Sequence, residues 1–325
     1  MRAMILAAGL GTRLKPFTNN HPKALAVVNG KTLLQRNIEY LQAYGIREVV
    51  VNVHHFADQI MEAVETNKGW GSTVTISDES SEVLETGGGV VFAKSFFEQE
   101  ENWLVMNADI LTNLDIDKLI AADKVLSEGA ENYIATLAVT NRVSSRNLLF
   151  TTEGNLIGWR NNTTREEKWA GVNNTEQPAG IHSIAKAFSG IQILHASFYS
   201  SLEMTGKFSL IDAYLQTGAK GTIGYYDHSD SILLDVGKPE NIEKAESLFK
   251  YAAEIKGDGV TADDIAYKRE EIEYLNFHLV EYPNEDFAFI TVRQFFMDVY
   301  NYHLFAGLMN SSDPTIAAVA AKSIK

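Results

Sequence analysis

The chain of 325 residues contains no cysteine and no long run of apolar residues. Without cysteine it can form no disulfide bond, no thiolate zinc site and no catalytic thiol. No segment approaches the roughly 18 consecutive apolar residues that a membrane-spanning helix needs. No charged leader with an apolar core precedes the first expected strand. We therefore expect a soluble cytoplasmic protein that does not contact a membrane.

Basic residues are scarce relative to acidic ones. The chain has 28 Lys and Arg residues against 42 Asp and Glu residues, which gives a formal net charge of −14. A surface that binds nucleic acid needs a basic footprint, so we expect no nucleic acid partner. A nucleotide is held by a few local charges and is not excluded. The length allows one large domain and a smaller one.

A glycine-rich stretch near the N-terminus carries the strongest signal. The apolar run Ala3 to Leu6 reads as a buried strand, and the sequence turns small and glycine-rich where that strand would end. Gly9 and Gly11 allow backbone angles that other residues resist and leave N–H groups uncovered. Arg13 and Lys23 add two positive charges. This combination predicts a binding site for a polyphosphate.

Two familiar phosphate-binding motifs do not fit this loop. A dinucleotide fingerprint would need a third glycine at the position of Leu14. The stretch Gly30-Lys31-Thr32 lacks the opening glycine of a P-loop, because Leu25 stands there. A surface turn that happens to carry Arg and Lys is the remaining alternative.

The loop resembles, residue for residue, the signature of the sugar nucleotidyltransferases, the NDP-sugar pyrophosphorylases. That signature reads Gly-x-Gly-Thr-Arg-Leu-x-Pro-x-Thr and then Pro-Lys, and it occurs here at residues 9–18 and 22–23. The resemblance implies a transfer reaction between a nucleoside triphosphate and a sugar 1-phosphate. It also implies nucleotide contacts from Leu6, Ala8, Gly9, Gly11, Thr12, Arg13 and Lys23.

The elements after the loop alternate between strand and helix. Thr32 can cap a helix with Leu34, Ile38 and Leu41 on one face, and Gly45 stands where the glycine after a helix end belongs. Residues 48–53 read as the next strand. A strand, helix, strand unit predicts a parallel sheet with its ligand crevice at the carboxyl ends of the strands. The predicted fold class is α/β, a doubly wound, Rossmann-like, mostly parallel sheet of the nucleotide-diphospho-sugar transferase type.

Carboxylates are the expected metal ligands. Asp109 follows the buried strand Trp103 to Met106, and the carboxyl end of a central strand beside a phosphate loop suits Mg²⁺. Taken alone, such an aspartate is more often a helix cap or a turn residue. His54 and His55 are adjacent on an extended segment, where neighbouring side chains point to opposite faces, so a shared metal ion is disfavoured.

Further site residues follow from the resemblance alone. The stretch Leu84-Glu85-Thr86-Gly87-Gly88-Gly89 is similar to the family segment over the nucleobase, and residues 232–237 are similar to the segment with the second metal carboxylate, Asp235. Residues 187–194 are similar to the strand that faces the sugar. The implied nucleotide contacts include Glu85, Gly87 and Asn107; the implied sugar contacts are Ser189 and Gly190; the implied ligands of Mg²⁺ are Asp109 and Asp235.

The implied catalytic residues are Arg13, Lys23, Asp109 and Asp235. The stretches at 84–89, 188–190 and 245–248 are similar to the uridylyltransferase branch of the family, which implies UTP with N-acetylmuramate 1-phosphate or a related hexose 1-phosphate. A catalytically inactive regulatory protein that binds nucleotide sugars is the alternative.

The sequence changes character near residue 251. From there it resembles an internal segment of the ferritin-like structural subunit of phenylacetyl-CoA epoxidase, over the blocks 277–288, 292–296, 312–314 and 320–325. No Glu-x-x-His pair occurs in residues 251–325, so no oxygenase activity is carried over. We expect a nucleotidyltransferase domain over residues 1–250 and a helical appendage over 251–325. The apolar face of this appendage predicts self-association or a helical partner.

Overall fold

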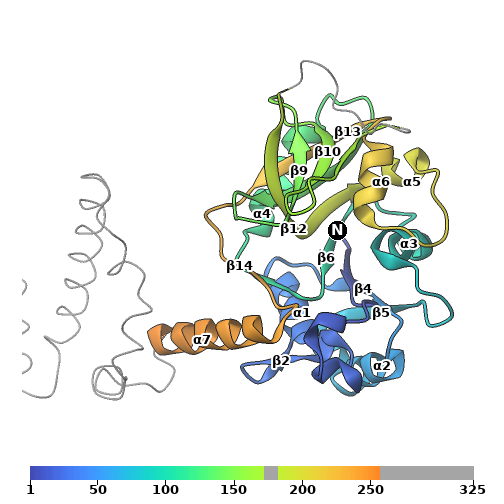
Figure 1. The fold of residues 1–325 in the computed structure, drawn as a ribbon. Helices are drawn as coiled ribbons and strands as arrows, with labels where there is room; N and C mark the ends of the chain where they lie inside the picture. The colour runs from blue at the N-terminus through green and yellow to red at the C-terminus, as the bar shows by residue number, and fades with distance from the viewer. Residues whose placement is uncertain (172–181, 257–325) are drawn as a thin grey trace, which may run out of the picture. The chain divides into compact units, whose positions relative to one another are not determined.

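The structure is a computed structural model, and it describes residues 1–171 and 182–256 (Figure 1). The chain divides into two units, Met1–Tyr251 and Ala252–Lys325. The first unit is described below. Most of the predicted appendage lies outside the described residues. Within the described ranges, no helix is both long enough and apolar enough to cross a membrane.

Strands and helices alternate along the first unit. The strands are β1 (Ala3–Leu6), β2 (Val27–Val28), β3 (Lys31–Thr32), β4 (Glu48–Val53), β5 (Thr73–Asp78), β6 (Asn102–Asn107), β7 (Ile110–Thr112), β8 (Tyr133–Thr140), β9 (Arg146–Phe150), β10 (Leu156–Asn161), β11 (Glu167–Trp169), β12 (Ile184–His195), β13 (Thr222–Asp227) and β14 (Leu233–Asp235). The α-helices are α1 (Leu33–Ala43), α2 (Ala57–Thr66), α3 (Glu85–Phe92), α4 (Ile116–Ser127), α5 (Ser197–Ser201), α6 (Leu210–Thr217) and α7 (Pro239–Lys256).

One ten-stranded sheet forms the centre of the unit. Its strands run in the order β11-β10-β9-β12-β6-β1-β4-β5, and β8 and β13 extend it from β12. The neighbours β6, β1, β4 and β5 are all parallel, whereas β12 is antiparallel to β6, β8 and β9. In register, Leu6 lies between Asn52 and Asn107, so the carboxyl ends of three parallel strands form one edge.

Helices cover both faces of this sheet. Ala3 and Ile5 of β1 belong to one buried cluster with α1, α2 and α4, while Met4 and Leu6 belong to a second with α3, α5 and α6. Alternate residues of a strand point to opposite faces, so the fully apolar β1 buries both. Figure 1 shows β4, β5, α1 and α2 gathered in one part of the unit and β9, β10 and β12 in the other. The predicted α/β doubly wound class is confirmed.

The ends of α1 follow the expected capping chemistry. The Thr32 side chain accepts a hydrogen bond from the Gln35 backbone N–H at 3.1 Å, as an N-cap does. At the other end Gly45 has a φ of +75° and donates to Gln42, and Ile46 donates to Leu41. This pair of bonds is a Schellman motif, which requires the left-handed glycine.

A buried polar cluster ties four elements together away from the carboxyl edge. Asp123 of α4, 2% exposed, accepts a hydrogen bond from Thr136 Oγ1 at 2.6 Å. His195 Nε2 lies 3.0 and 3.1 Å from its two carboxylate oxygens, and Asn102 Nδ2 donates at 3.5 Å. His195 pairs with Asn102 at the start of β6, the end opposite Asn107.

We predict that Asp123→Asn lowers the free energy of unfolding by about 2 kcal/mol, because an amide offers one acceptor oxygen where several donors converge. Urea denaturation of the purified protein measures this loss. Asp117→Asn, on the exposed side of the same helix, is the control and should change stability little. Equal denaturation midpoints for the two variants would contradict the role given to Asp123.

Candidate active site

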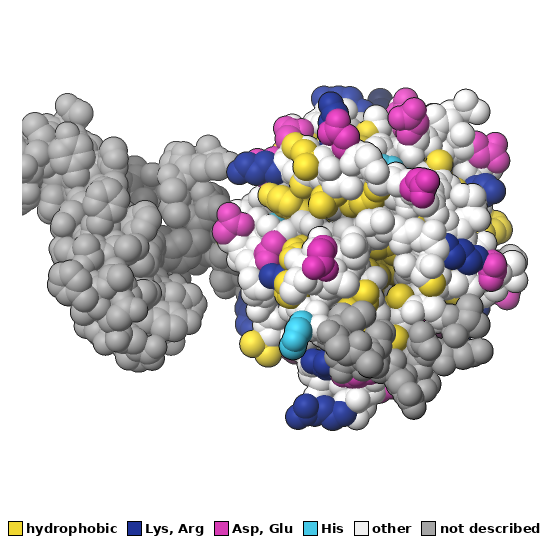
Figure 2. Space-filling model, turned by 90° about the horizontal axis from the view of Figure 1, so that it is seen from above, with side chains coloured by type: hydrophobic (Ala, Val, Ile, Leu, Met, Phe, Trp, Pro, Cys, Tyr) yellow, Lys and Arg dark blue, Asp and Glu magenta, His cyan; other side chains and the backbone are white. Residues whose placement is uncertain are grey.

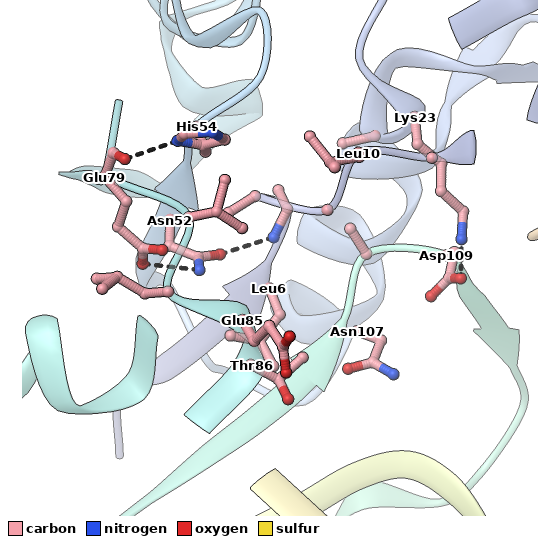
Figure 3. A pocket seen from close by; sticks show the side chains of 18 of the residues that line it. Leu6, Leu10, Lys23, Asn52, His54, Glu79, Glu85, Thr86, Asn107 and Asp109 are labelled. Atoms are coloured by element: carbon pink, nitrogen blue, oxygen red, sulfur yellow. Dashed lines mark hydrogen bonds and ion pairs between the residues drawn. The ribbon is translucent and has the colours of Figure 1, made fainter. Parts of the chain in front are cut away.

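A cavity of 470 Å³ opens at the carboxyl edge of the parallel strands. The ends of β1, β4 and β6 form its floor, and the glycine loop after β1 covers one side (Figure 3). Its lining includes the predicted nucleotide contacts at the loop other than Arg13, together with residues from the start of α3. The lining residues include Ala8, Gly9, Gly11, Lys23, Asn52, Glu79, Glu85, Asn107, Asp109 and Lys207.

The glycine loop is held in one shape by its own side chains. Gly11 has a φ of +61°, and a methyl group on its Cα would lie 2.8 Å from Thr18 Cγ2 and 3.1 Å from Lys23 Cβ. The Thr18 hydroxyl donates to the Gly11 carbonyl at 2.8 Å. Among the described residues, nothing accepts a hydrogen bond from the backbone N–H groups of residues 8–11. These groups are available to a ligand with phosphate oxygens.

The four predicted catalytic residues lie in one cluster. The Lys23 ammonium forms an ion pair with Asp109 Oδ2, and Arg13 Nη2 lies 3.9 Å from Asp235 Oδ2. A methyl group on Gly237 would lie 2.6 Å from Asp235 Oδ1, 2.8 Å from Arg13 Nη2 and 3.1 Å from Lys23 Nζ. Two cations and the Asp235 carboxylate thus meet around one bare Cα, and Asp109 joins them through its ion pair with Lys23.

Backbone pairing and packing bring these residues together. Strands β7 and β14 are antiparallel, with Asp235 opposite Ile110, and the Val236 N–H donates to the Asp109 carbonyl at 2.8 Å. A third buried cluster contains Leu14 from the loop region, Leu111 from β7 and Val236. Each of these apolar residues lies next to, or two positions from, a charged one, so burying them fixes the cluster.

The start of α3 lines one part of the cavity. Glu85, the first residue of α3, adopts a φ of +61°, which is unusual for a residue with a side chain. Its carboxylate lies 3.7 Å from Lys207 Nζ. Gly87 lies outside the lining; a methyl group there would lie 2.5 Å from the Phe208 ring. The helix glycines therefore admit the chain segment that carries Lys207, in addition to any role beside a base.

Ser189 and Gly190, the predicted sugar contacts, lie on β12 and are not among the residues that line the cavity. Ser189 is 1% exposed, and its hydroxyl lies 2.7 Å from His228 Nε2. Burial lowers the pKa of the His228 imidazole. Gly190 has a φ of +74°, and a methyl group there would lie 2.6 Å from Asn107 Nδ2. The bare Cα of Gly190 thus lets β12 approach Asn107.

Possible metal ligands are carboxylates. Within residues 1–171 and 182–256, no three His, Asp or Glu side chains form a cluster that could hold a metal ion alone. His54 donates from Nδ1 to the Glu79 carbonyl at 2.7 Å, and the His55 ring packs against Phe56. Asp109 and Asp235 could supply oxygen ligands to a cation that completes its shell with oxygens of the bound substrate.

Sequence reasoning missed several lining residues. Asn52, at the end of β4, accepts from the Ala7 N–H and donates to Glu79, which is 1% exposed. Burial raises the pKa of the Glu79 carboxyl. Lys207 brings a third cation to the cavity. Polar residues at the carboxyl ends of predicted parallel strands are the one signal that could have identified Asn52.

Acidic and basic side chains are interspersed on the face of the molecule in Figure 2.

The comparisons with known proteins divide the chain in two. Residues 2–146 match the model of the family described as nucleotidyl transferase, and residues 240–325 match that of the family described as phenylacetic acid catabolic protein. The second match begins inside α7.

Individual relatives repeat this division. Over 93 residues the chain is 47% identical to the N-acetylmuramate alpha-1-phosphate uridylyltransferase of Caulobacter vibrioides. This match covers 28% of this chain and 38% of the relative. Over 96 residues it is 41% identical to one subunit of the 1,2-phenylacetyl-CoA epoxidase of Escherichia coli, covering 30% of this chain and 38% of that protein. The chain therefore spans about two fifths of the length of these two curated relatives.

A solved structure extends the first likeness beyond residue 146. HddC from Yersinia pseudotuberculosis, crystallised with GMP-PN, has a TM-score of 0.59 and 25% sequence identity; the match covers 76% of this chain and 99% of HddC. Both resemblances are confirmed: residues 2–146 match the nucleotidyl transferase family, and residues 240–325 match the phenylacetic acid catabolic protein family.

Proposed function

We propose that the first unit catalyses nucleotidyl transfer from a nucleoside triphosphate to a sugar 1-phosphate. One observation carries this proposal: Arg13, Lys23 and Asp235 meet around Gly237 and Asp109 pairs with Lys23, beside a loop in which the N–H groups of residues 8–11 have no partner in the described chain. A loop of free amides, two cations and two carboxylates is what a triphosphate with its metal ion requires. The family match and the likeness to HddC support the same reaction class.

The carboxylate pair fits Mg²⁺. This ion takes oxygen ligands, keeps several waters and is held in phosphate-transfer sites by one or two carboxylates together with substrate phosphates. Asp109 is 15% and Asp235 40% exposed at the side chain, so both are within reach of solvent and ligand. When bound by these two residues, Mg²⁺ would neutralise charge on the phosphates and help to align them.

The residues of the chain act by placement and charge. A phosphate oxygen of the sugar 1-phosphate forms a bond to the α-phosphorus, and the bond from that phosphorus to the bridging oxygen breaks, so pyrophosphate leaves with the electron pair. Lys23, at 16% side-chain exposure, holds phosphate oxygens near the reacting centre. Arg13, at 58%, holds the departing pyrophosphate. Oriented donors of this kind stabilise the charge that develops during transfer.

For the substrates, we propose UTP with N-acetylmuramate 1-phosphate or a related hexose 1-phosphate. The similarity to the uridylyltransferase of Caulobacter vibrioides supports this choice. We further propose that residues 1–250 form the catalytic domain. Binding of a second copy or a helical partner by residues 251–325 stays a prediction.

A matrix of nucleoside triphosphates against sugar 1-phosphates, assayed for pyrophosphate with and without Mg²⁺, tests the proposed function. We expect pyrophosphate only when both substrates and the metal ion are present, and most rapidly with UTP. Chelation of the metal should stop the release. A protein that binds nucleotide sugars but releases no pyrophosphate with any pair would instead be the inactive regulatory protein, and the proposed function would be wrong.

We predict that Lys23→Ala and Asp109→Asn each lower kcat about a hundredfold or more, because each removes one oriented charge at the reacting centre. Steady-state rates of pyrophosphate release measure the loss, and circular dichroism verifies the fold. Lys31→Ala is a matched control, since Lys31 also forms an ion pair, with Glu39 at 2.7 Å, but lies on the surface. Turnover near the unmodified rate in Lys23→Ala would remove Lys23 from its role.

We predict that Gly237→Ala lowers kcat about a hundredfold while the protein stays folded. The added methyl group would lie too close to Asp235 and to both cations, so at least one charged group must move, and small displacements of reacting groups have effects of this size. Kinetics and a thermal melt on the same preparation separate misplacement from unfolding. Unchanged kinetics would mean that the four charged groups do not act from this cluster.

A further inference from the structure

A buried side chain connects the start of the glycine loop to the neighbouring strand. Beyond Leu6 the chain leaves the sheet, and the next N–H, that of Ala7, donates to Asn52 Oδ1 at 2.7 Å. Asn52 lies opposite Leu6 in the parallel pairing of β1 with β4 and is 2% exposed. The side chain of Asn52 therefore adds one hydrogen bond at the point where the loop departs.

The orientation of the Asn52 amide is determined by its partners. A backbone N–H can only donate, so the Asn52 oxygen must face Ala7 and its NH₂ group must face away. That group donates to Glu79 Oε1 at 2.9 Å. A buried carboxyl group, charged or neutral, can accept this bond. The chain of contacts thus runs in one direction, from Ala7 through Asn52 to Glu79. Figure 3 shows the bond between Asn52 and Glu79.

Glu79 is itself anchored to β4. Its backbone N–H donates to the Val53 carbonyl at 2.8 Å, and its carbonyl accepts from His54 Nδ1 at 2.7 Å. On the other side, a methyl group on Gly89 would lie 2.8 Å from both Asn52 Nδ2 and Glu79 Oε1. The glycine of α3 therefore makes the space that this pair fills.

We infer that Asn52 and Glu79 are positioning residues that set the direction in which the free amides of residues 8–11 point at the triphosphate. The inference rests on the proposed function. Neither side chain needs to touch the reacting atoms. Because the Ala7 N–H is the last bonded amide before the unpartnered ones, a shift of Ala7 moves the whole amide array. Loss of the pair should therefore raise KM for the triphosphate more than it lowers kcat.

Asn52→Asp is the most informative single variant. The new carboxylate can still accept the hydrogen bond from the Ala7 N–H. Its second oxygen takes the place of the Asn52 NH₂ group, which lies 2.9 Å from Glu79 Oε1. Two carboxyl groups this close must share a proton. His54 and Asp78 are the other titratable groups facing this site, and Gly89, from α3, contributes no charge. As the pH rises the shared proton is lost and the two groups repel, so KM should rise with pH more steeply than in the unmodified protein.

The experiment compares Asn52→Asp, Glu79→Gln and the double variant N52D/E79Q in the full chain. Once the shared proton is lost, we expect about a tenfold or greater rise in KM and in the dissociation constant for UTP in Asn52→Asp, the size expected for loss of the buried hydrogen bond between residues 52 and 79. In the double variant the introduced glutamine amide can donate to the introduced carboxylate, so both constants and the pH profile should return toward the unmodified values. Glu79→Gln alone keeps an acceptor and should change them less than Asn52→Asp.

Asp123→Asn, at the other end of the sheet, controls for general destabilisation and should leave KM for UTP unchanged. Unchanged UTP constants in Asn52→Asp, or no recovery in the double variant, would overturn the inference while pyrophosphate release by the unmodified protein still supports the proposed function. If the unmodified protein binds UTP without turnover, the dissociation constants still decide the role of the pair. If it binds none of the nucleoside triphosphates, both are wrong; if it binds another one in place of UTP, the same constants measured with that triphosphate decide the role of the pair.

Discussion

The short pairing of β14 with β7 is the constraint on which the candidate site depends. The bond from the Val236 N–H to the Asp109 carbonyl joins two segments more than a hundred residues apart and brings their carboxylates to one place. Burial of Leu14 and Leu111 with Val236 supplies the apolar contribution that makes this pairing stable. The side chains of Arg13 and Asp235 are 58% and 40% exposed, so their attraction is weak, and packing rather than this ion pair brings Asp235 to the cluster.

Glycine serves the site mainly as a means of close approach. Gly237 admits two cations and a carboxylate, Gly89 admits Asn52 and Glu79, and Gly190 admits Asn107. At two of these positions, 89 and 237, no left-handed backbone angle is involved, so the absence of a side chain is what matters. A glycine run that reads as flexibility in the sequence thus marks backbone and side chains pressed together, as in protein interiors generally.

Local patterns were predictable from the sequence and long-range partnerships were not. The strand Ala3–Leu6, the Thr32 cap and the glycine after α1 each depend on neighbouring residues, and the fold class follows from their alternation. The link from Ala7 to Asn52 spans 45 positions and carries no motif, so only the folded chain reveals it. Lys207 was missed for the same reason, since its segment reaches the cavity through the contacts of α3 with Phe208.

The balance of charge at the site explains how an acidic chain can suit a polyphosphate. Each of the two cations of the cluster is already within ion-pair distance of a carboxylate, so the cluster is close to neutral as it stands. A triphosphate alone would face Asp109 and Asp235, and a divalent cation alone would face Arg13 and Lys23. Each ligand offsets the repulsion that the other meets, so each favours binding of the other. The net charge of −14 is spread over the whole chain, and salt screens its distant charges, so it has little influence at the cluster.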